Sequence, residues 1–397
     1  MGFGTLAIIA AAGLIGPLLA LRSGWNIPVV LGELVAGLVL GASGFGWLDA
    51  ADQTFTFLAD IGFALIMFVA GSHVPVRDPI LRRGVRPAFL RAIAIGVISA
   101  VIGVALSTAF NTGHAALYAV LMASSSAALI FPIVDSLRLS GPSVLELLPQ
   151  VAIADAVCIV ALPLVIDPAN AGRAGLGAAA VISCAVLAFF LLRAFEKSGM
   201  RRRVHRISRR RKFAVELRIS LAILFTLAAV AVGTHVSIML AGFAFGLVVA
   251  AIGEPRRLAK QLFALTEGFL GPVFFVWLGA SLDIGDLATQ PSLILLGLLL
   301  GLGALLAHAA MRVTGQPLAI GAMACAQLGV PIAAATLATQ LHLLAPGEAP
   351  ALILGALVTV VVTVVAGGVA ARGSAAGGSP PTKPATDEPP PASSVAE

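Results

Sequence analysis

Long apolar runs divided by short polar connections set the pattern of this sequence. Thirteen such runs can be counted, each close to the length of about 20 residues that an α-helix needs to cross a bilayer. They are predicted near 4–21, 27–42, 54–73, 87–110, 114–137, 143–166, 174–195, 213–232, 235–252, 261–281, 291–313, 317–341 and 348–371. The pattern therefore predicts an all-α polytopic membrane protein with about thirteen transmembrane helices.

Two neighbouring runs carry polar residues where a lipid-spanning helix should have none. The run 114–137 contains three consecutive serines at 124–126, followed by Pro132, and the run 143–166 carries Asp155 near its centre. A carboxylate at mid-membrane costs about 2.5–3.5 kcal/mol on insertion scales and marks a functional site by default. Interrupted helix backbone survives at that depth only against protein or a water-filled cavity. A broken helix beside a buried carboxylate is how many secondary transporters build a cation site.

A third run, 317–341, has a matching interruption at Gln327, Gly329 and Pro331. When Gly113 is aligned with Gly315, Ser125 falls on Gln327 without gaps. The two runs lie seven helices apart in the predicted order, an odd number, so they cross the membrane in opposite directions. Paired interrupted helices in two inverted halves point to a transport site between them.

Composition excludes a soluble globular protein. The chain is 59% hydrophobic and 11% charged, with a mean hydropathy of +1.02. Its three cysteines, Cys158, Cys184 and Cys325, are scattered singly, which argues against a disulfide framework and a structural metal site. No dinucleotide fingerprint or Walker lysine motif occurs, so we expect no cofactor, no ATP-driven step and no enzymatic activity. The first apolar run has no basic region before it, so we predict a first membrane helix and not a signal peptide.

Positive charge is confined to alternate connections. Of the 25 Lys and Arg residues, 11 lie between Arg193 and Arg218, in one connection flanked by apolar runs. Such a loop anchors the cytoplasmic side and attracts anionic lipid, so the net charge of +6 does not indicate nucleic acid. The asymmetry predicts a multi-pass cell-membrane protein with its N-terminus outside and its C-terminus cytoplasmic. Residues 373–397 are rich in Pro, Ala, Ser and Gly and are predicted to be a disordered cytoplasmic tail after a transmembrane domain at 1–372.

Four segments in order resemble the monovalent cation:proton antiporter-2 family, whose membrane domain is sodium/hydrogen exchanger-like. IPVVLGELVAGLVLG resembles the family's GELLAGILLG signature, and LADIGFALIMFVAGSHV resembles its leader into a FLAGLE-type end. ASSSAALIF resembles the SATSxAVV stretch of the broken helix, and GPVFFVWLGASLDIGDL is similar to PLFFxxxGxxLD. The resemblance implies two crossing broken helices in inverted repeats and a homodimer. It also implies a core of helices at about 87–166 and 291–371, with the other helices forming a scaffold.

The sequence departs from that family at three places. Where relatives have paired Asp-Asp or Asn-Asp, this chain has Ala154 before Asp155. The place of a basic residue in the eleventh helix falls near Gly303 by spacing, with His308 more than a turn away. Gln327 is not followed by the Gly-Glu that relatives often carry. The transport carboxylate is kept while its charged companions are missing.

The residues predicted to bind cation and proton are Asp155, Ser124, Ser125, Ser126 and Gln327. An ionised carboxylate can pair with Na⁺ or K⁺ or take up a proton, and hydroxyl and carbonyl oxygens suit hard cations. The alternative for Asp155 is a structural carboxylate bound to the broken-helix backbone, and for the serines it is small-residue packing. Gln327 could instead cap its broken helix.

Glu33 and His308 are secondary candidates. The alternatives for Glu33 are a place in a cytoplasmic funnel and an ion pair with an arginine such as Arg22. His308 can pair with a carboxylate or titrate, but a lone histidine in an apolar helix is more often structural. Glu267 is predicted to be interfacial, and Gln150 to reach the Asp155 cavity.

These patterns favour a secondary antiporter that exchanges H⁺ for Na⁺ or K⁺, with no metal beyond the transported cation. With one titratable group, exchange is predicted to be electroneutral and 1:1. The alternatives are a transporter of the same fold for an organic solute, a non-transporting membrane sensor and a channel-like efflux pathway.

Overall fold

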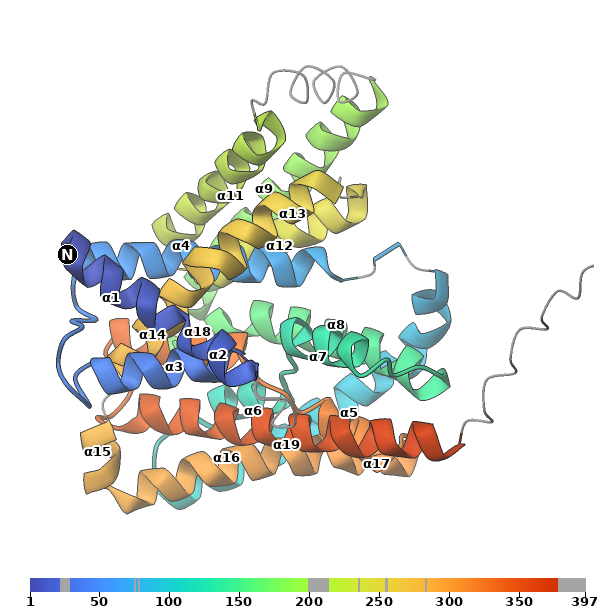
Figure 1. The fold of residues 1–397 in the computed structure, drawn as a ribbon. Coiled ribbons are helices and arrows are strands. Elements are labelled where there is room, and N and C mark those ends of the chain that lie inside the picture. Colours follow the sequence, from blue (N-terminus) through green and yellow to red (C-terminus); the bar gives the residue numbers. More distant parts are fainter. Residues whose placement is uncertain are drawn as a thin grey trace, which may run out of the picture.

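The computed structural model is built of helices throughout the residues that it describes (Figure 1). These are residues 1–377 except 22–28, 75, 78, 199–213, 235, 254–255 and 283. By length and composition alone, eight helices of this part are long and apolar enough to cross a membrane, and five apolar helices are shorter. Together they occupy the thirteen predicted runs, so the predicted all-α architecture is confirmed.

The two predicted breaks are present. The fifth run is α6 (Ala115–Ala123) and α7 (Ala127–Ser136), with the serines at 124–126 unwound between them. The twelfth is α17 (Leu318–Met323) and α18 (Gly329–Gln340), with 324–328 unwound. Gln327 lies in the second unwound stretch, whereas Gly329 and Pro331 lie in the first turn of α18.

One group of helices packs around the two broken helices. It consists of α5 (Pro79–Phe110), α8 (Pro142–Ile166), α16 (Pro291–Ala309) and α19 (Glu348–Gly377). Within it, α5 packs on α6 and α8, while α16 and α17 pack on α19. Each of the first three begins with proline, whose fixed φ and missing N–H suit the first helical position.

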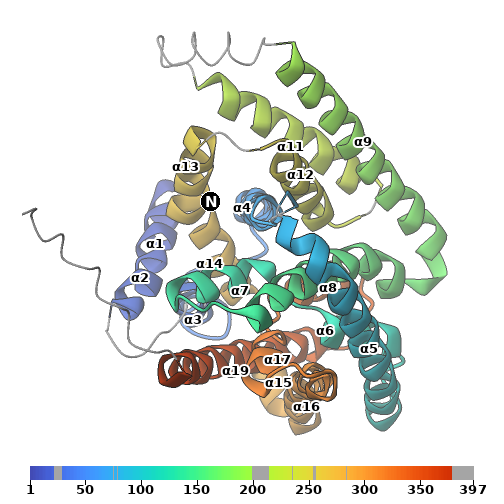
Figure 2. The same cartoon turned by 90° about the vertical axis from the view of Figure 1, so that its right-hand side faces the viewer.

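The remaining helices form a second group. Its members are α1 (Phe3–Gly13), α2 (Ile15–Ala20), α3 (Val29–Leu40), α4 (Gln53–Ser72), α9 (Ala171–Lys197), α11 (Val215–Gly233), α12 (Ile238–Ile252), α13 (Arg256–Leu265) and α14 (Gly271–Ser281). Here α4 packs on α12 and α14, and α3 on α14. Figures 1 and 2 show α9 and α11 at one edge of the molecule and α16 with α19 at the opposite edge.

Glycine allows α3 and α14 to pack backbone to backbone. A Cβ placed on Gly37 would overlap the carbonyl oxygen of Val276, and one on Gly279 would overlap that of Leu34. Small residues at such contacts let membrane helices gain dispersion energy where the hydrophobic effect gives little.

Four details depart from the predicted boundaries. α5 begins at Pro79, well before the predicted 87, and a short helix α15 (Ile284–Thr289) occupies a predicted connection. A π-helical turn, η2 (Thr266–Leu270), joins α13 to α14. α19 continues to Gly377, past the predicted start of the tail at 373. The rest of the tail lies outside the described residues.

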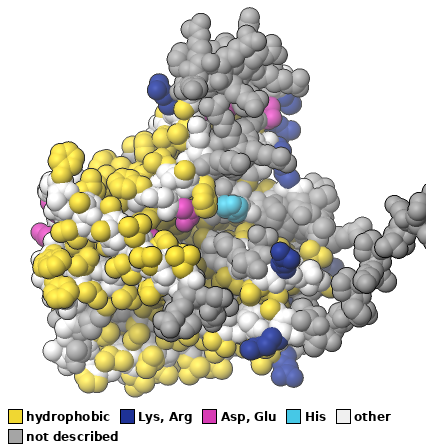
Figure 3. All heavy atoms as spheres, in the orientation of Figure 1, with side chains coloured by type: hydrophobic (Ala, Val, Ile, Leu, Met, Phe, Trp, Pro, Cys, Tyr) yellow, Lys and Arg dark blue, Asp and Glu magenta, His cyan; other side chains and the backbone are white. Residues whose placement is uncertain are grey.

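On the face seen in Figure 3, hydrophobic side chains cover much of the surface, and most Lys and Arg side chains lie toward the right and the top. Arg77 lies in the connection between α4 and α5, and Arg256 and Arg257 begin α13. We call the membrane side that these residues share the basic side.

Candidate functional site

Asp155 lies at the middle of α8, where its side chain meets the first break. The residue is 5% exposed, and its Oδ2 accepts a hydrogen bond from the backbone N–H of Ala127 at 3.0 Å. Ala127 is the first residue of α7, so this N–H has no partner within its own helix. The carboxylate therefore sits at the positive end of a half-helix, which stabilises its negative charge.

The three serines point to different partners. Ser124 Oγ donates to the carbonyl of Leu121 at 2.7 Å, in the last turn of its own helix. Ser125 Oγ donates to the carbonyl of Ala324 at 2.6 Å, in the second unwound stretch. Ser126 is 3% exposed, and its carbonyl accepts the first helical bonds of α7. Ser125 thus joins the two breaks directly, and the predicted crossing of broken helices is confirmed.

His308 reaches this crossing, although it lies more than a turn from the position near Gly303 that the spacing indicated. Its Nε2 is 3.3 Å from Ser125 Oγ, and its Nδ1 is 2.9 Å from the carbonyl of Ala304. The spacing argument pointed to Gly303, but a Cβ there would meet Met122 of α6. Since α6 packs along α16, the position that faces the break lies further toward the end of α16.

The hydrogen-bond partners of His308 indicate which protonation states its imidazole can adopt. The Ala304 carbonyl requires a proton on Nδ1, and Ser125 gives its only proton to Ala324. Neutral imidazole then has no proton left for the contact between Nε2 and Ser125 Oγ. An imidazolium would satisfy all three contacts, so this buried histidine has a stereochemical place for a second proton.

Gln327 is anchored by its backbone. Its N–H donates to Thr359 Oγ1 at 3.0 Å, and Thr359 donates to the carbonyl of Ala356 at 2.7 Å. The side chain is buried, and its Nε2 has no hydrogen-bond partner within the described structure. This amide can still hydrogen-bond to a solute, but no contact with Asp155 is found among the described residues.

The sequence interpretation missed two polar contacts on the basic side. Gln316 Nε2 donates to Gln150 Oε1 at 3.0 Å, so Gln150 pairs with a residue just before the second broken helix, and its reach to the Asp155 cavity stays a prediction. Arg91 donates to Glu146 at 2.7 Å and to Thr314 Oγ1 at 2.8 Å. The available signal was an arginine inside the apolar run 87–110, since a charge there needs a partner, and the structure leaves Arg91 only 6% exposed.

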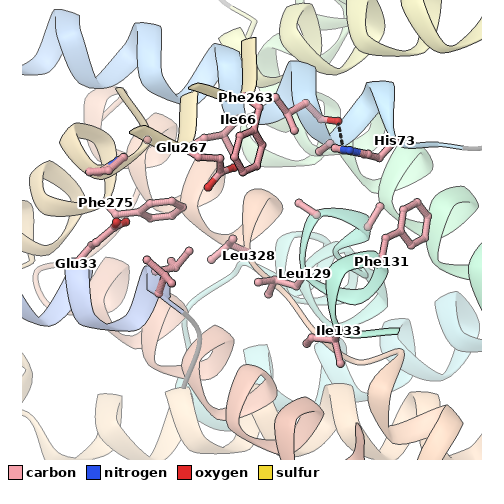
Figure 4. A pocket seen from close by; sticks show the side chains of 18 of the residues that line it. Glu33, Ile66, His73, Leu129, Phe131, Ile133, Phe263, Glu267, Phe275 and Leu328 are labelled. Atoms are coloured by element: carbon pink, nitrogen blue, oxygen red, sulfur yellow. Dashed lines mark hydrogen bonds between the residues drawn. The ribbon is translucent and has the colours of Figure 1, made fainter. Parts of the chain in front are cut away.

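A cavity of about 820 Å³ opens beside the first break, between the two groups of helices. Ala127 lines it, so it reaches the residue whose N–H holds Asp155. Leu328 of the second break lines it as well, and Glu33 and Glu267 stand on its far wall (Figure 4). Glu33 therefore lines this cavity, while Arg22, its alternative partner, lies outside the described residues.

The oxygen donors at the crossing suit a small hard cation. They are the Asp155 carboxylate and the hydroxyls of Ser124 and Ser125. Among the described residues no cluster of three or more His, Cys, Asp or Glu is found. One carboxylate can be neutralised by one monovalent cation or by one proton, which makes the two competitors for the same group.

Comparison with known proteins agrees with this geometry. Residues 7–371 match the family model described as sodium/hydrogen exchanger, transmembrane. The chain belongs to this family. Exchangers of this kind are transporters and not enzymes. The antiporter-type resemblance drawn from four short segments is thereby confirmed over nearly the whole chain.

Relatives of this exchanger-family chain include named antiporters. It is 25% identical to the putative Na(+)/H(+) antiporter YjbQ of Bacillus subtilis over 89% of this chain and 61% of that protein. It is 26% identical to the probable Na(+)/H(+) antiporter 3 of Methanocaldococcus jannaschii over 66% of this chain and 67% of the relative. It is 28% identical to the glutathione-regulated potassium-efflux system protein KefC of Enterobacter sp. over 73% of this chain and 46% of that protein. The chain thus spans only part of the length of these relatives.

Solved structures share the fold. The sodium proton antiporter MjNhaP1 from Methanocaldococcus jannaschii superposes with a TM-score of 0.63 at 16% identity, covering 93% of this chain and 98% of the other. Its electron-microscopy structure gives a TM-score of 0.67 at 17% identity, over 96% of this chain and all of the other. The shared arrangement of helices is what this likeness establishes.

Proposed function

We propose that this chain exchanges H⁺ for Na⁺ or K⁺ across the membrane, with Asp155 as the group that binds each in turn. The observation that carries the proposal is the hydrogen bond from Ala127 N–H to Asp155, which places a buried carboxylate at a helix break beside a cavity. The names of the relatives support a proton and a monovalent cation as substrates.

Transport would proceed by alternating access. The helices around the two breaks would move relative to the second group, carrying Asp155 from one side to the other. Ser125 would keep the two broken helices together during the movement, since it links them through Ala324. In the present conformation the cavity opens toward the basic side, which we take as cytoplasmic.

Three further features stay proposals of the same kind. They are a homodimer formed by the second group of helices, anionic lipid bound at the 193–218 loop, and electroneutral 1:1 exchange. Most of that loop, 199–213, lies outside the described residues.

The test is a proteoliposome assay with a trapped pH dye, to which Na⁺, K⁺ and Li⁺ are added in turn. If the chain is an exchanger, at least one of these cations should change the dye signal in the proteoliposomes, and none should change it in empty liposomes. No response to any of the three would favour the organic-solute or sensor alternatives.

A further inference from the structure

The two walls of the cavity differ in charge. One wall carries Glu33 from α3 and Glu267 from the π-helical turn, and the opposite wall is formed by apolar residues such as Leu129 and Ile133 of α7 (Figure 4). Both carboxylates belong to the second group of helices, which does not carry Asp155. They are therefore separate from Asp155, which is hydrogen-bonded to the cavity-lining residue Ala127.

The π-helical turn explains how Glu267 comes to face the cavity. Pro272 has no N–H to give to the carbonyl of Gly268, so a regular helix cannot continue through this point. The chain widens into the turn Thr266–Leu270, and such single π-turns often occur at functional sites. The sequence interpretation placed Glu267 at the membrane interface, and the structure moves it into the cavity wall.

Of the two carboxylates, Glu33 is the one whose surroundings indicate a bound cation. It is 3% exposed, lines the cavity, and has neither a hydrogen bond nor an ion pair with any described residue. A buried carboxylate without a partner is costly, and a cation in the cavity would remove that cost. Glu267 stands between Glu33 and the imidazole of His73 in Figure 4, and it is exposed to the cavity.

We propose that Glu33 and Glu267 form a second binding site for a monovalent cation, which gathers the ion from the basic side before it reaches Asp155. The inference rests on the proposed exchange. A cleft lined by one sign of charge and bounded by apolar walls concentrates counter-ions by roughly tenfold or more. The site acts on loading from one side only, because it stays behind when the helices that carry Asp155 turn to the other side.

Sidedness gives the sharpest test. Everted and right-side-out membrane vesicles with a trapped pH dye report the apparent KM for Na⁺ and for K⁺ at each face. For Glu33→Gln, Glu267→Gln and the double variant, we expect the KM on the basic side to rise roughly three- to tenfold. The KM on the other side and the maximal rate should stay unchanged. The matched control is Glu196→Gln, a carboxylate on α9 near the same membrane side that does not line the cavity.

An ionic-strength series separates a site from a general surface charge. Choline chloride screens interactions between exposed charges that lie more than about 8 Å apart at physiological ionic strength, and it screens buried charges much less. The ratio of variant to wild-type KM for Glu33→Gln should therefore persist at high choline chloride. Should that substitution prevent folding, Glu267→Gln carries the sidedness test alone.

Failures of the two proposals are distinguishable. Three results would overturn the second site while exchange still depended on Asp155. They are an equal KM on the basic side for variants and wild type, a changed KM at both faces, and a variant-to-wild-type KM ratio for Glu33→Gln that vanishes at high salt. Exchange that survives loss of Asp155 would instead overturn the proposed function.

Discussion

At the residue scale, one carboxylate and one hydroxyl organise the crossing of the broken helices. Asp155 was predictable, because a charge in the middle of an apolar run is rare and expensive. The different roles of Ser124 and Ser125 were not predictable. Which serine crosses to the other break depends on the direction in which the unwound backbone turns, and neighbouring identical residues carry no signal of it.

The two serines give a matched pair of substitutions. Ser125→Ala removes the bond to Ala324 and leaves a buried carbonyl with one donor fewer, a cost of about 1–3 kcal/mol. Ser124→Ala removes only a bond within α6. We expect Ser125→Ala to lower the exchange rate severalfold and the melting temperature of the detergent-purified protein, with Ser124→Ala close to wild type. Equal behaviour of the two variants would remove Ser125 as the link.

At the element scale, the sequence predicted where helices break but not how their ends are held. Serines, glycine and proline mark the interruptions, because they release backbone groups that a continuous helix would satisfy. The start of α19 is tied to the start of α6 by Glu348, which is 1% exposed. It accepts hydrogen bonds from His114 Nδ1 and from Tyr118 Oη, both at 2.7 Å. Contacts between helices so far apart in the sequence need the fold to be known.

The contact between α6 and α19 should make stability depend on pH. Hydrogen bonding to Glu348 raises the pKa of His114 above its usual 6.5. A raised pKa in the folded state contributes stability that is fully present below pH 6.5 and is lost as pH rises through the folded-state value. His114→Ala should therefore lower the melting temperature at pH 6 and have less effect at pH 9.

The effect of His114→Ala on the melting temperature is measured by thermal unfolding of the purified protein between pH 6 and pH 9. The control is His342→Asn, in which asparagine tolerates the φ of 55° found at position 342. A difference from wild type that grows with pH would contradict the interpretation.

At the scale of the whole molecule, orientation and coupling follow from charge. The basic loop predicts that position 205 faces the cytoplasm. With Cys158, Cys184 and Cys325 replaced, His205→Cys should react with an impermeant thiol reagent only after the cells are opened. Labelling in intact cells would reverse the topology and with it the side to which the cavity opens.

Coupling is predicted to be electroneutral because Asp155 binds either one cation or one proton. A potential of 100 mV is worth about 2.3 kcal/mol per charge, so an electrogenic carrier would shift its equilibrium ion ratio roughly fifty-fold. We expect the reversal point in valinomycin-clamped proteoliposomes not to move between two potentials at a fixed pH gradient, with Na⁺ as the test cation.

His308 is the one group at the crossing with a place for a second proton. A reversal point that moves with voltage in the wild type and becomes fixed in His308→Ala would assign the extra proton to this histidine.

The most direct measurement of the central claim is proton flux driven by a cation gradient in proteoliposomes that contain Asp155→Asn. An amide can neither release a proton nor offset the charge of a cation, so the flux should fall to that of empty liposomes. Asp155→Glu should retain part of it with altered cation affinity, and Asp49→Asn, in the connection before α4, should match wild type. Full exchange by Asp155→Asn, in protein that elutes as a folded species, would contradict the account and move the site elsewhere, with Glu33 as the next candidate.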